Sequence, residues 1–223
     1  MINIEKGIVE EIIERVGNSQ RLKVEIGEKK YKAINYNYLT GSAEKGDNVL
    51  LNTTAEDLKL GTGGYHFVLF NLTKGKTKNI DGHIMKLRYS PYQISCLSIE
   101  ETKSPFHDVL KDKEEIDGMP VIISSLHSQL PSIVVALKKI KKDIKISYIQ
   151  TDAGALPIDF SYIYSYLKDK GLIDVSITSE HSFGGEWEAI NVYSGLLASK
   201  HVFKVDITVI GLGPGIVGTG TKY

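Results

Sequence analysis

The second half of the chain alternates short apolar runs with amphipathic segments. Four runs rich in β-branched residues predict buried strands, at Pro120–Ser125, Ile144–Ile149, Ile173–Thr178 and Val205–Ile210. Three segments with apolar residues at helical spacing lie between them, at Pro131–Lys142, Asp159–Lys170 and Glu186–Ser199. Because strand and helix alternate three times, we expect a parallel sheet with right-handed crossovers. The pattern predicts a Rossmann-like α/β domain over residues 119–223.

The first half shows period-two alternation and glycine-rich turns instead. Leu22, Val24 and Ile26 share one face before a reversal at Gly27, which predicts a hairpin. Further short strands follow glycine turns, a spacing typical of a small barrel. We therefore predict a small β-rich, barrel-like domain over residues 1–103, with a charged linker at 104–118 that joins it to the α/β domain.

The stretch Gly82–Pro91 predicts a half-buried strand, with Met85, Leu87 and Tyr89 facing inward and Lys86 and Arg88 facing outward. That basic outer face could meet a phosphate, or it could simply be solvated. Nearby, the only cysteine, Cys96, lies in a strand-like pattern, which favours a buried apolar role over a nucleophilic one.

Composition narrows the class of protein. The 27 basic and 27 acidic side chains balance, so the overall charge predicts neither nucleic acid nor an anionic membrane as a partner. A single cysteine excludes an internal disulfide and is typical of a reducing compartment. No signal peptide or membrane-length apolar run is evident. We expect a soluble cytoplasmic protein with a sizeable core, and a homo-oligomer is compatible with this composition.

Polar residues gather directly after each predicted strand. Parallel strands bring such residues to one edge of a sheet, where open α/β folds bind ligands. Two histidines and two carboxylates stand out as candidate catalytic residues: His127, Asp152, His181 and Glu186. They could hold a divalent metal, or one histidine oriented by Asp152 could move a proton.

Each of these residues also has a structural interpretation. His127 could cap a helix or bind a loop carbonyl, Asp152 is a common turn residue, and Glu186 could begin a helix. Neither a zinc-type H-E-x-x-H, a G-x-S-x-G elbow nor a P-loop pattern is present, which argues against those three chemistries.

The last strand runs into a glycine-rich stretch, with candidate cofactor-binding residues Gly211, Gly213, Gly215, Gly218 and Gly220. Gly213, Gly215 and Gly218 match the spacing G-x-G-x-x-G, in which backbone N–H groups approach a phosphate. The helix and acidic residue that complete a dinucleotide site would lie beyond Tyr223, so the cofactor stays unassigned.

Three stretches carry a resemblance to a known family: Gly82–Pro91, His127–Leu130 and Gly213–Thr221. On them the chain resembles a bacterial family of uncharacterised proteins, one of the numbered domains of unknown function. The resemblance extends over the whole chain and implies no activity or catalytic residue. Because family members continue beyond the glycine stretch, we expect the present sequence to be truncated within that motif.

These observations lead to one functional expectation and one alternative. The α/β domain is expected to bind a phosphorylated or nucleotide-like small molecule at the carboxyl edge of its sheet, and we hypothesise that it does so as an enzyme. In the alternative, the protein is a non-catalytic scaffold or regulatory module whose glycines only allow close packing.

Overall fold

Two units, Met1–Asn79 and Ile80–Tyr223, make up the chain in the computed structural model, which describes residues 1–75 and 82–215. Residues 82–103, which the sequence pattern grouped with the first domain, belong to the second unit. None of the helices in the described ranges is long and apolar enough to cross a bilayer.

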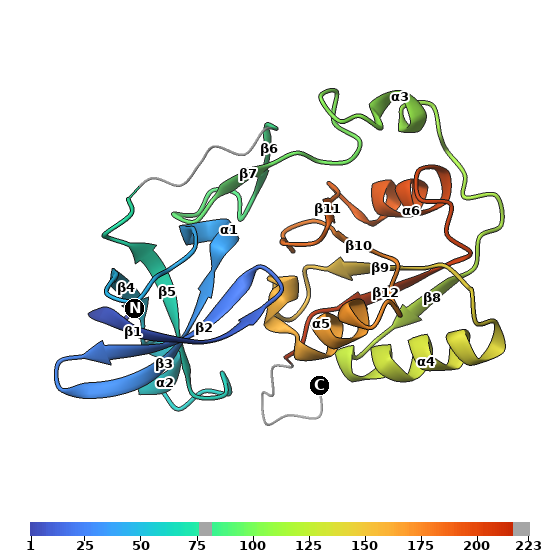
Figure 1. Cartoon of the computed structure of the whole chain (residues 1–223). Helices are drawn as coiled ribbons and strands as arrows, with labels where there is room; N and C mark the ends of the chain where they lie inside the picture. Colours follow the sequence, from blue (N-terminus) through green and yellow to red (C-terminus); the bar gives the residue numbers. More distant parts are fainter. Residues whose placement is uncertain (76–81, 216–223) are drawn as a thin grey trace. The chain divides into compact units, whose positions relative to one another are not determined.

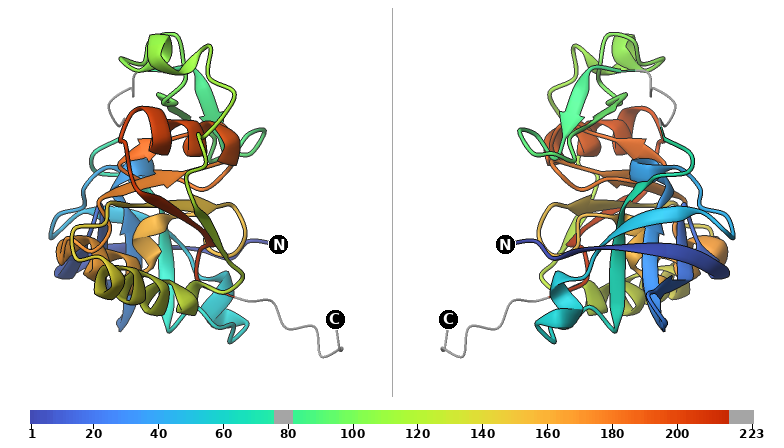
Figure 2. Two further views of the ribbon diagram at one scale, coloured as in Figure 1. Left: turned by 90° about the vertical axis from the view of Figure 1, so that its right-hand side faces the viewer. Right: turned by 90° about the vertical axis from the view of Figure 1, so that its left-hand side faces the viewer.

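The first unit is a closed five-stranded barrel (Figure 1). Its elements are β1 (Ile4–Val16), β2 (Ser19–Ile26), β3 (Lys29–Tyr36), α1 (Asn37–Thr40), β4 (Asn48–Asn52), α2 (Thr54–Asp57) and β5 (Tyr65–Asn71). The strand order around the barrel is β1-β2-β3-β5-β4, and β4 pairs with β1 to close it. Figure 2 shows β1 in dark blue as the longest of these strands.

The period-two alternation explains the core of the barrel. Leu22 and Val24 of β2 are fully buried against Ala33 of β3 and Leu51 of β4. The β2–β3 hairpin pairs from Ser19 opposite Tyr36 to Ile26 opposite Lys29. The predicted hairpin and barrel are therefore confirmed.

The second unit begins with a small antiparallel hairpin and continues as an α/β layer structure. Its elements are β6 (Ile84–Lys86), β7 (Ile94–Cys96), α3 (His107–Leu110), β8 (Val121–Ser124), η1 (His127–Gln129), α4 (Leu130–Ile140), β9 (Ile146–Thr151), η2 (Ile158–Phe160), α5 (Tyr162–Asp169), β10 (Val175–Thr178), β11 (Trp187–Glu188), α6 (Val192–His201) and β12 (Ile207–Leu212). The strands β8 to β12 form one parallel sheet in the order β11-β10-β9-β12-β8.

Helices cover both faces of this sheet (Figures 1 and 2). On one face, Val134 of α4 and Leu167 of α5 pack with Tyr148 and Val209. On the other face, Ala198 of α6 packs with residues of β9, β10 and β12, including Ile149 and Ile210. The chain moves in one direction across the sheet from β8 to β11 and returns at β12, so right-handed crossovers place α6 opposite α4 and α5. The mixed α/β prediction is confirmed.

Two local predictions are wrong. The segment from Glu186 to Ser199 does not form one helix, because Trp187–Glu188 adds the short strand β11 beside β10, and α6 begins only at Val192. The orientation predicted for the strand after Gly82 is also inverted, since Lys86 is 1% exposed while Tyr89 is 100% exposed. Lys86 points inward because its ammonium forms an ion pair with the buried carboxylate of Glu188.

Candidate functional site

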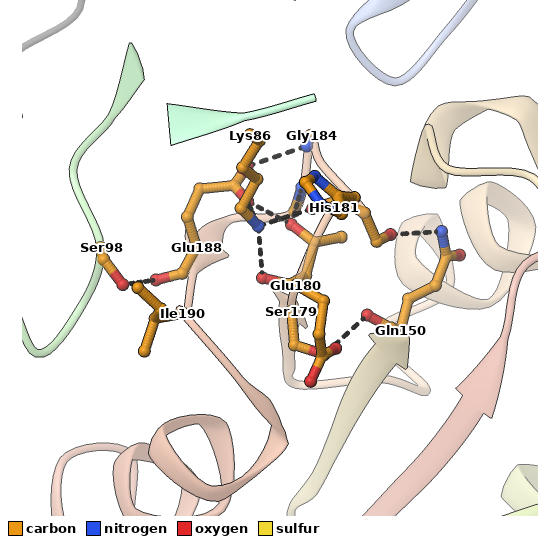
Figure 3. A network of polar contacts seen from close by, with 12 residues as sticks. Lys86, Ser98, Gln150, Ser179, Glu180, His181, Gly184, Glu188 and Ile190 are labelled. Carbon is orange, nitrogen blue, oxygen red and sulfur yellow. Dashed lines mark hydrogen bonds and ion pairs between the residues drawn. The ribbon is translucent and has the colours of Figure 1, made fainter. Parts of the chain in front are cut away.

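A buried ion pair fastens the β6–β7 hairpin to the edge of the parallel sheet. Lys86 Nζ lies 2.5 Å from Glu188 Oε2 of β11. The same ammonium donates to the carbonyl oxygens of Thr178 at 2.8 Å and Ser182 at 2.5 Å. All three protons of the ammonium therefore have acceptors. Figure 3 shows this pair within a network of polar contacts that includes His181 and Gln150.

The Glu188 carboxylate is equally well satisfied. Its Oε1 accepts from the Gly184 amide at 2.8 Å, and its Oε2 also accepts from Thr178 Oγ1 at 2.6 Å. Burial raises the pKa of Glu188, and Lys86, Thr178 and Gly184 oppose that shift. Because neither group has a free donor or acceptor facing solvent, the pair positions the hairpin and has no atoms left for a ligand.

This attachment brings the loop after β6 to His181, which follows the carboxyl end of β10. The Leu87 amide donates to His181 Nδ1 at 3.0 Å. Nδ1 is therefore unprotonated, and a neutral ring must carry its proton on Nε2. Arg88 Nη2 lies 3.4 Å from that same Nε2. Two N–H donors thus lie side by side, and an acceptor oxygen placed next to both, off the line that joins them, could accept from each.

The backbone around these two donors is strained. Leu87, Tyr89 and Glu180 have φ values of +52°, +59° and +52°. They are three of the six non-glycine residues with positive φ in the described part of the chain. Left-handed backbone in residues with side chains costs free energy and is concentrated at functional sites. The Tyr89 ring, which follows Arg88 directly, is held fully in solvent.

Gln150, at the end of β9, contributes a second polar group beside this edge. Its Nε2 lies 2.8 Å from Ser182 Oγ and 3.2 Å from the Ala155 and Leu156 carbonyl oxygens. Its Oε1 is buried and, among the described residues, has no hydrogen-bond partner. Buried polar atoms are rarely left unsatisfied in folded proteins.

His127 occupies a different position, at the start of η1. Its Nδ1 lies 3.0 Å from the Leu212 carbonyl oxygen, so Nδ1 carries the proton. Its Nε2 lies 2.6 Å from the hydroxyl of Ser161, which in turn accepts from the Tyr164 amide as the N-cap of α5. Burial lowers the pKa of His127. The neutral ring thus links the end of β12 to the start of α5.

Neither of the two predicted carboxylates is hydrogen-bonded or ion-paired to His181 in the described residues. Glu186 forms an ion pair with Lys168 of α5 at 2.7 Å and accepts from the Ser176 amide. Asp152 is exposed in the turn after β9. No two of the four predicted catalytic residues are hydrogen-bonded or ion-paired to each other in the described structure. Within residues 1–75 and 82–215, no group of three or more His, Cys, Asp or Glu side chains could hold a metal ion.

The described glycines of the C-terminal stretch have structural roles in the strand end and the turn that follows it. Gly211 lies inside β12, paired on both sides. The Gly213 amide donates to the Ala153 carbonyl at 3.0 Å, and a Cβ at Gly213 would come 2.0 Å from the Ala155 oxygen. Gly215 has φ +107°, which favours glycine. Gly218 and Gly220 lie outside the described residues. The amide of Gly213 is therefore already engaged within the fold.

Sequence patterns predict His181 as a site residue, but they predict the orientation of only one of its two neighbours, Arg88 and Tyr89. The sequence pattern predicts Arg88 on a basic strand face, whereas it wrongly predicts Tyr89 inside. Cys96 is buried, as predicted, and burial raises the pKa of its thiol to about 12. A neutral thiol enclosed in this way is not a nucleophile.

Comparison with known proteins gives a family and no activity. Neither the curated proteins nor the solved structures include a match to this chain. A family model described as a protein of unknown function, DUF3866, matches residues 32–223, so the chain belongs to that family.

Proposed function

We propose that the second unit binds a phosphorylated, nucleotide-like small molecule at the carboxyl edge of its parallel sheet, in the manner of Rossmann-like sheets. The observation that carries the proposal is the 3.4 Å approach of Arg88 Nη2 to His181 Nε2, while the Leu87 amide occupies Nδ1. A phosphate oxygen next to both donors would accept from each. Arginine is well suited to this task because its planar fork matches phosphate geometry.

The electrostatics of Arg88 favour an anion from outside the chain. In the described structure no carboxylate lies within ion-pair distance of its guanidinium, which remains exposed to solvent. The neighbouring buried pair is already neutralised, since Lys86 and Glu188 offset each other. An incoming phosphate would therefore meet one uncompensated positive charge and the His181 N–H.

Tyr89 supports a ligand that carries a ring in addition to phosphate. Its side chain is fully exposed, and its φ of +59° costs free energy that no packing of the ring offsets. An aromatic ring in solvent beside an arginine suits stacking on a nucleobase. The ligand we propose accordingly places phosphate on Arg88 and His181 and its base on Tyr89.

A ligand screen followed by variants tests this proposal. Thermal unfolding of the whole chain should be shifted upward by nucleotides or sugar phosphates, but not by uncharged nucleosides at the same concentration. Arg88→Gln and His181→Gln should each abolish most of the shift. Lys103→Gln, which removes an exposed positive charge elsewhere in the second unit, should retain it. Absence of a shift with every class of phosphate would favour the scaffold alternative.

A further inference from the structure

The barrel of the first unit offers a second surface with its own chemistry. Its strands β1, β2 and β3 form an antiparallel meander, β5 pairs with β3 in parallel, and β4 closes the barrel against β1. This is the strand order of OB-fold barrels, which bind oligonucleotides or oligosaccharides across their second and third strands. A fold alone does not establish a function, so the ligand class must be inferred from the side chains on that face.

One row of side chains across this face combines two lysines and a tyrosine. Lys23 of β2 lies directly opposite Lys32 of β3, and Lys32 lies opposite Tyr65 of β5. Like charges directly opposite each other destabilise an antiparallel strand pair. The fold therefore places two positive charges where a nearby polyanion would relieve their repulsion.

Acidic neighbours do not neutralise the whole row. Glu10 lies 2.6 Å from Lys30 Nζ and 4.0 Å from Lys23 Nζ. Lys32 forms no ion pair with any described residue, and its ammonium lies 5.7 Å from the centre of the Tyr65 ring. Its charge is consequently available to a ligand that lies over that ring.

Aromatic side chains continue along β5 on the same face. Tyr65 and Phe67 are two residues apart on one strand, so both point to the same side of the barrel wall, and both are half-buried. Phe67 lies opposite Ile34, in the row next to Lys32 and Tyr65. The face thus presents Lys32 beside the Tyr65 ring, and in the next row the half-buried Phe67 ring stacks on Tyr36.

We propose that this face, centred on Lys23, Lys32 and Tyr65, binds single-stranded nucleic acid. Proteins that bind single strands combine positive charge along the phosphate backbone with aromatic rings on which bases stack. A neutral oligosaccharide would use the rings but leave the charge of Lys32 without a counter-charge. The balanced charge of the whole chain is compatible with such a site, because the net charge does not determine the local charge of one row of side chains across three strands.

Fluorescence anisotropy of the whole chain with a labelled single strand of about 12 nucleotides tests the proposal. Tyr65→Leu should weaken binding by about tenfold or more, whereas Tyr65→Phe should preserve it. Lys32→Gln should weaken binding and reduce the slope of log K against log salt by about 0.7. Lys6→Gln removes an exposed lysine of β1 that lies opposite Leu50 of β4, outside the row across β2, β3 and β5, and should change neither quantity.

Three outcomes would overturn the proposal. One is absence of binding to single-stranded DNA and RNA at low salt. Another is an equal loss in Lys6→Gln and Lys32→Gln, which would indicate a diffuse charge effect. The third is displacement of the labelled strand by a neutral oligosaccharide, which would assign the aromatic row to sugar binding. Thermal unfolding of each variant confirms that its barrel is intact.

Discussion

Lys86 Nζ lies 2.5 Å from Glu188 Oε2 although 102 residues separate the two along the chain. This pair holds the β6–β7 hairpin on the sheet and thereby brings Leu87 to His181. Lys86→Met should lower the free energy of unfolding of the second unit by about 3–5 kcal/mol, because it leaves the Glu188 carboxylate buried without its counter-charge. Trp187, the single tryptophan, precedes Glu188, so its fluorescence during chemical denaturation reports this unit.

A double-mutant cycle separates the pair from its surroundings. Lys86→Met combined with Glu188→Leu should destabilise the unit by less than the sum of the single changes, since no unpaired charge remains. Lys111→Met breaks the ion pair with Asp108, in which both side chains are well exposed, and should cause no measurable change. Strictly additive effects of Lys86→Met and Glu188→Leu would contradict the assigned coupling.

His127 should make the second unit sensitive to mild acid. Burial holds its folded-state pKa below the ordinary value of 6.5, so the unfolded chain binds a proton more readily. Its contribution to stability is therefore complete above pH 6.5 and is lost as the pH falls from there through the folded-state pKa. Denaturation curves followed through Trp187 at a series of pH values measure this loss.

His127→Gln provides the comparison for that titration. Glutamine keeps a donor and an acceptor but does not ionise near neutral pH, so the variant should be less stable at pH 7 yet lose less stability in mild acid. If the stability of the variant and of the natural sequence falls equally with pH, groups other than His127 cause the acid sensitivity.

Close packing between two loops predicts a strong effect at Gly213. A Cβ there would lie 2.0 Å from the Ala155 oxygen, so Gly213→Ala must push apart the loops that follow β9 and β12. Overpacking of this kind costs about 1–3 kcal/mol, which Trp187 fluorescence can measure. Ala153→Ser changes an exposed side chain in the same contact and should be neutral. Full stability of Gly213→Ala would show that the contact is loose.

Tyr89 should affect ligand affinity without affecting stability. Because its ring is fully exposed, Tyr89→Ala removes no packing from the fold. Loss of base stacking should weaken nucleotide binding by about 1–3 kcal/mol, while the affinity for pyrophosphate, which has no ring, should stay unchanged in isothermal titration calorimetry. Equal weakening for both ligands would place the effect of Tyr89 on the phosphate subsite instead.

The sequence predicted the parallel sheet well because its signals are local. Runs such as Ile144–Ile149 are β-branched and apolar, and the segments between them have helical periodicity, so each element could be recognised on its own. The Lys86–Glu188 pair has no local signal. Alternation of Met85, Leu87 and Tyr89 indicated an inward face, and only a carboxylate far along the chain reverses it.

The candidate site shows the same division between local and long-range information. His181 follows a strand end, and this position in the sequence is enough to predict it as a site residue. Its tautomer depends on the Leu87 amide from a hairpin 94 residues away, which no spacing rule can foresee. Glu186 was expected near His181, but the β11 strand directs it to Lys168, because Trp187 and Glu188 pair with β10.

The most direct test of the central claim is a crystal structure of the chain with the phosphorylated ligand that stabilises it most. We predict a phosphate oxygen within hydrogen-bond distance of both Arg88 Nη2 and His181 Nε2, with the ring of the ligand against Tyr89. A phosphate bound elsewhere, with Arg88 and His181 in contact only with solvent, would contradict the proposed site.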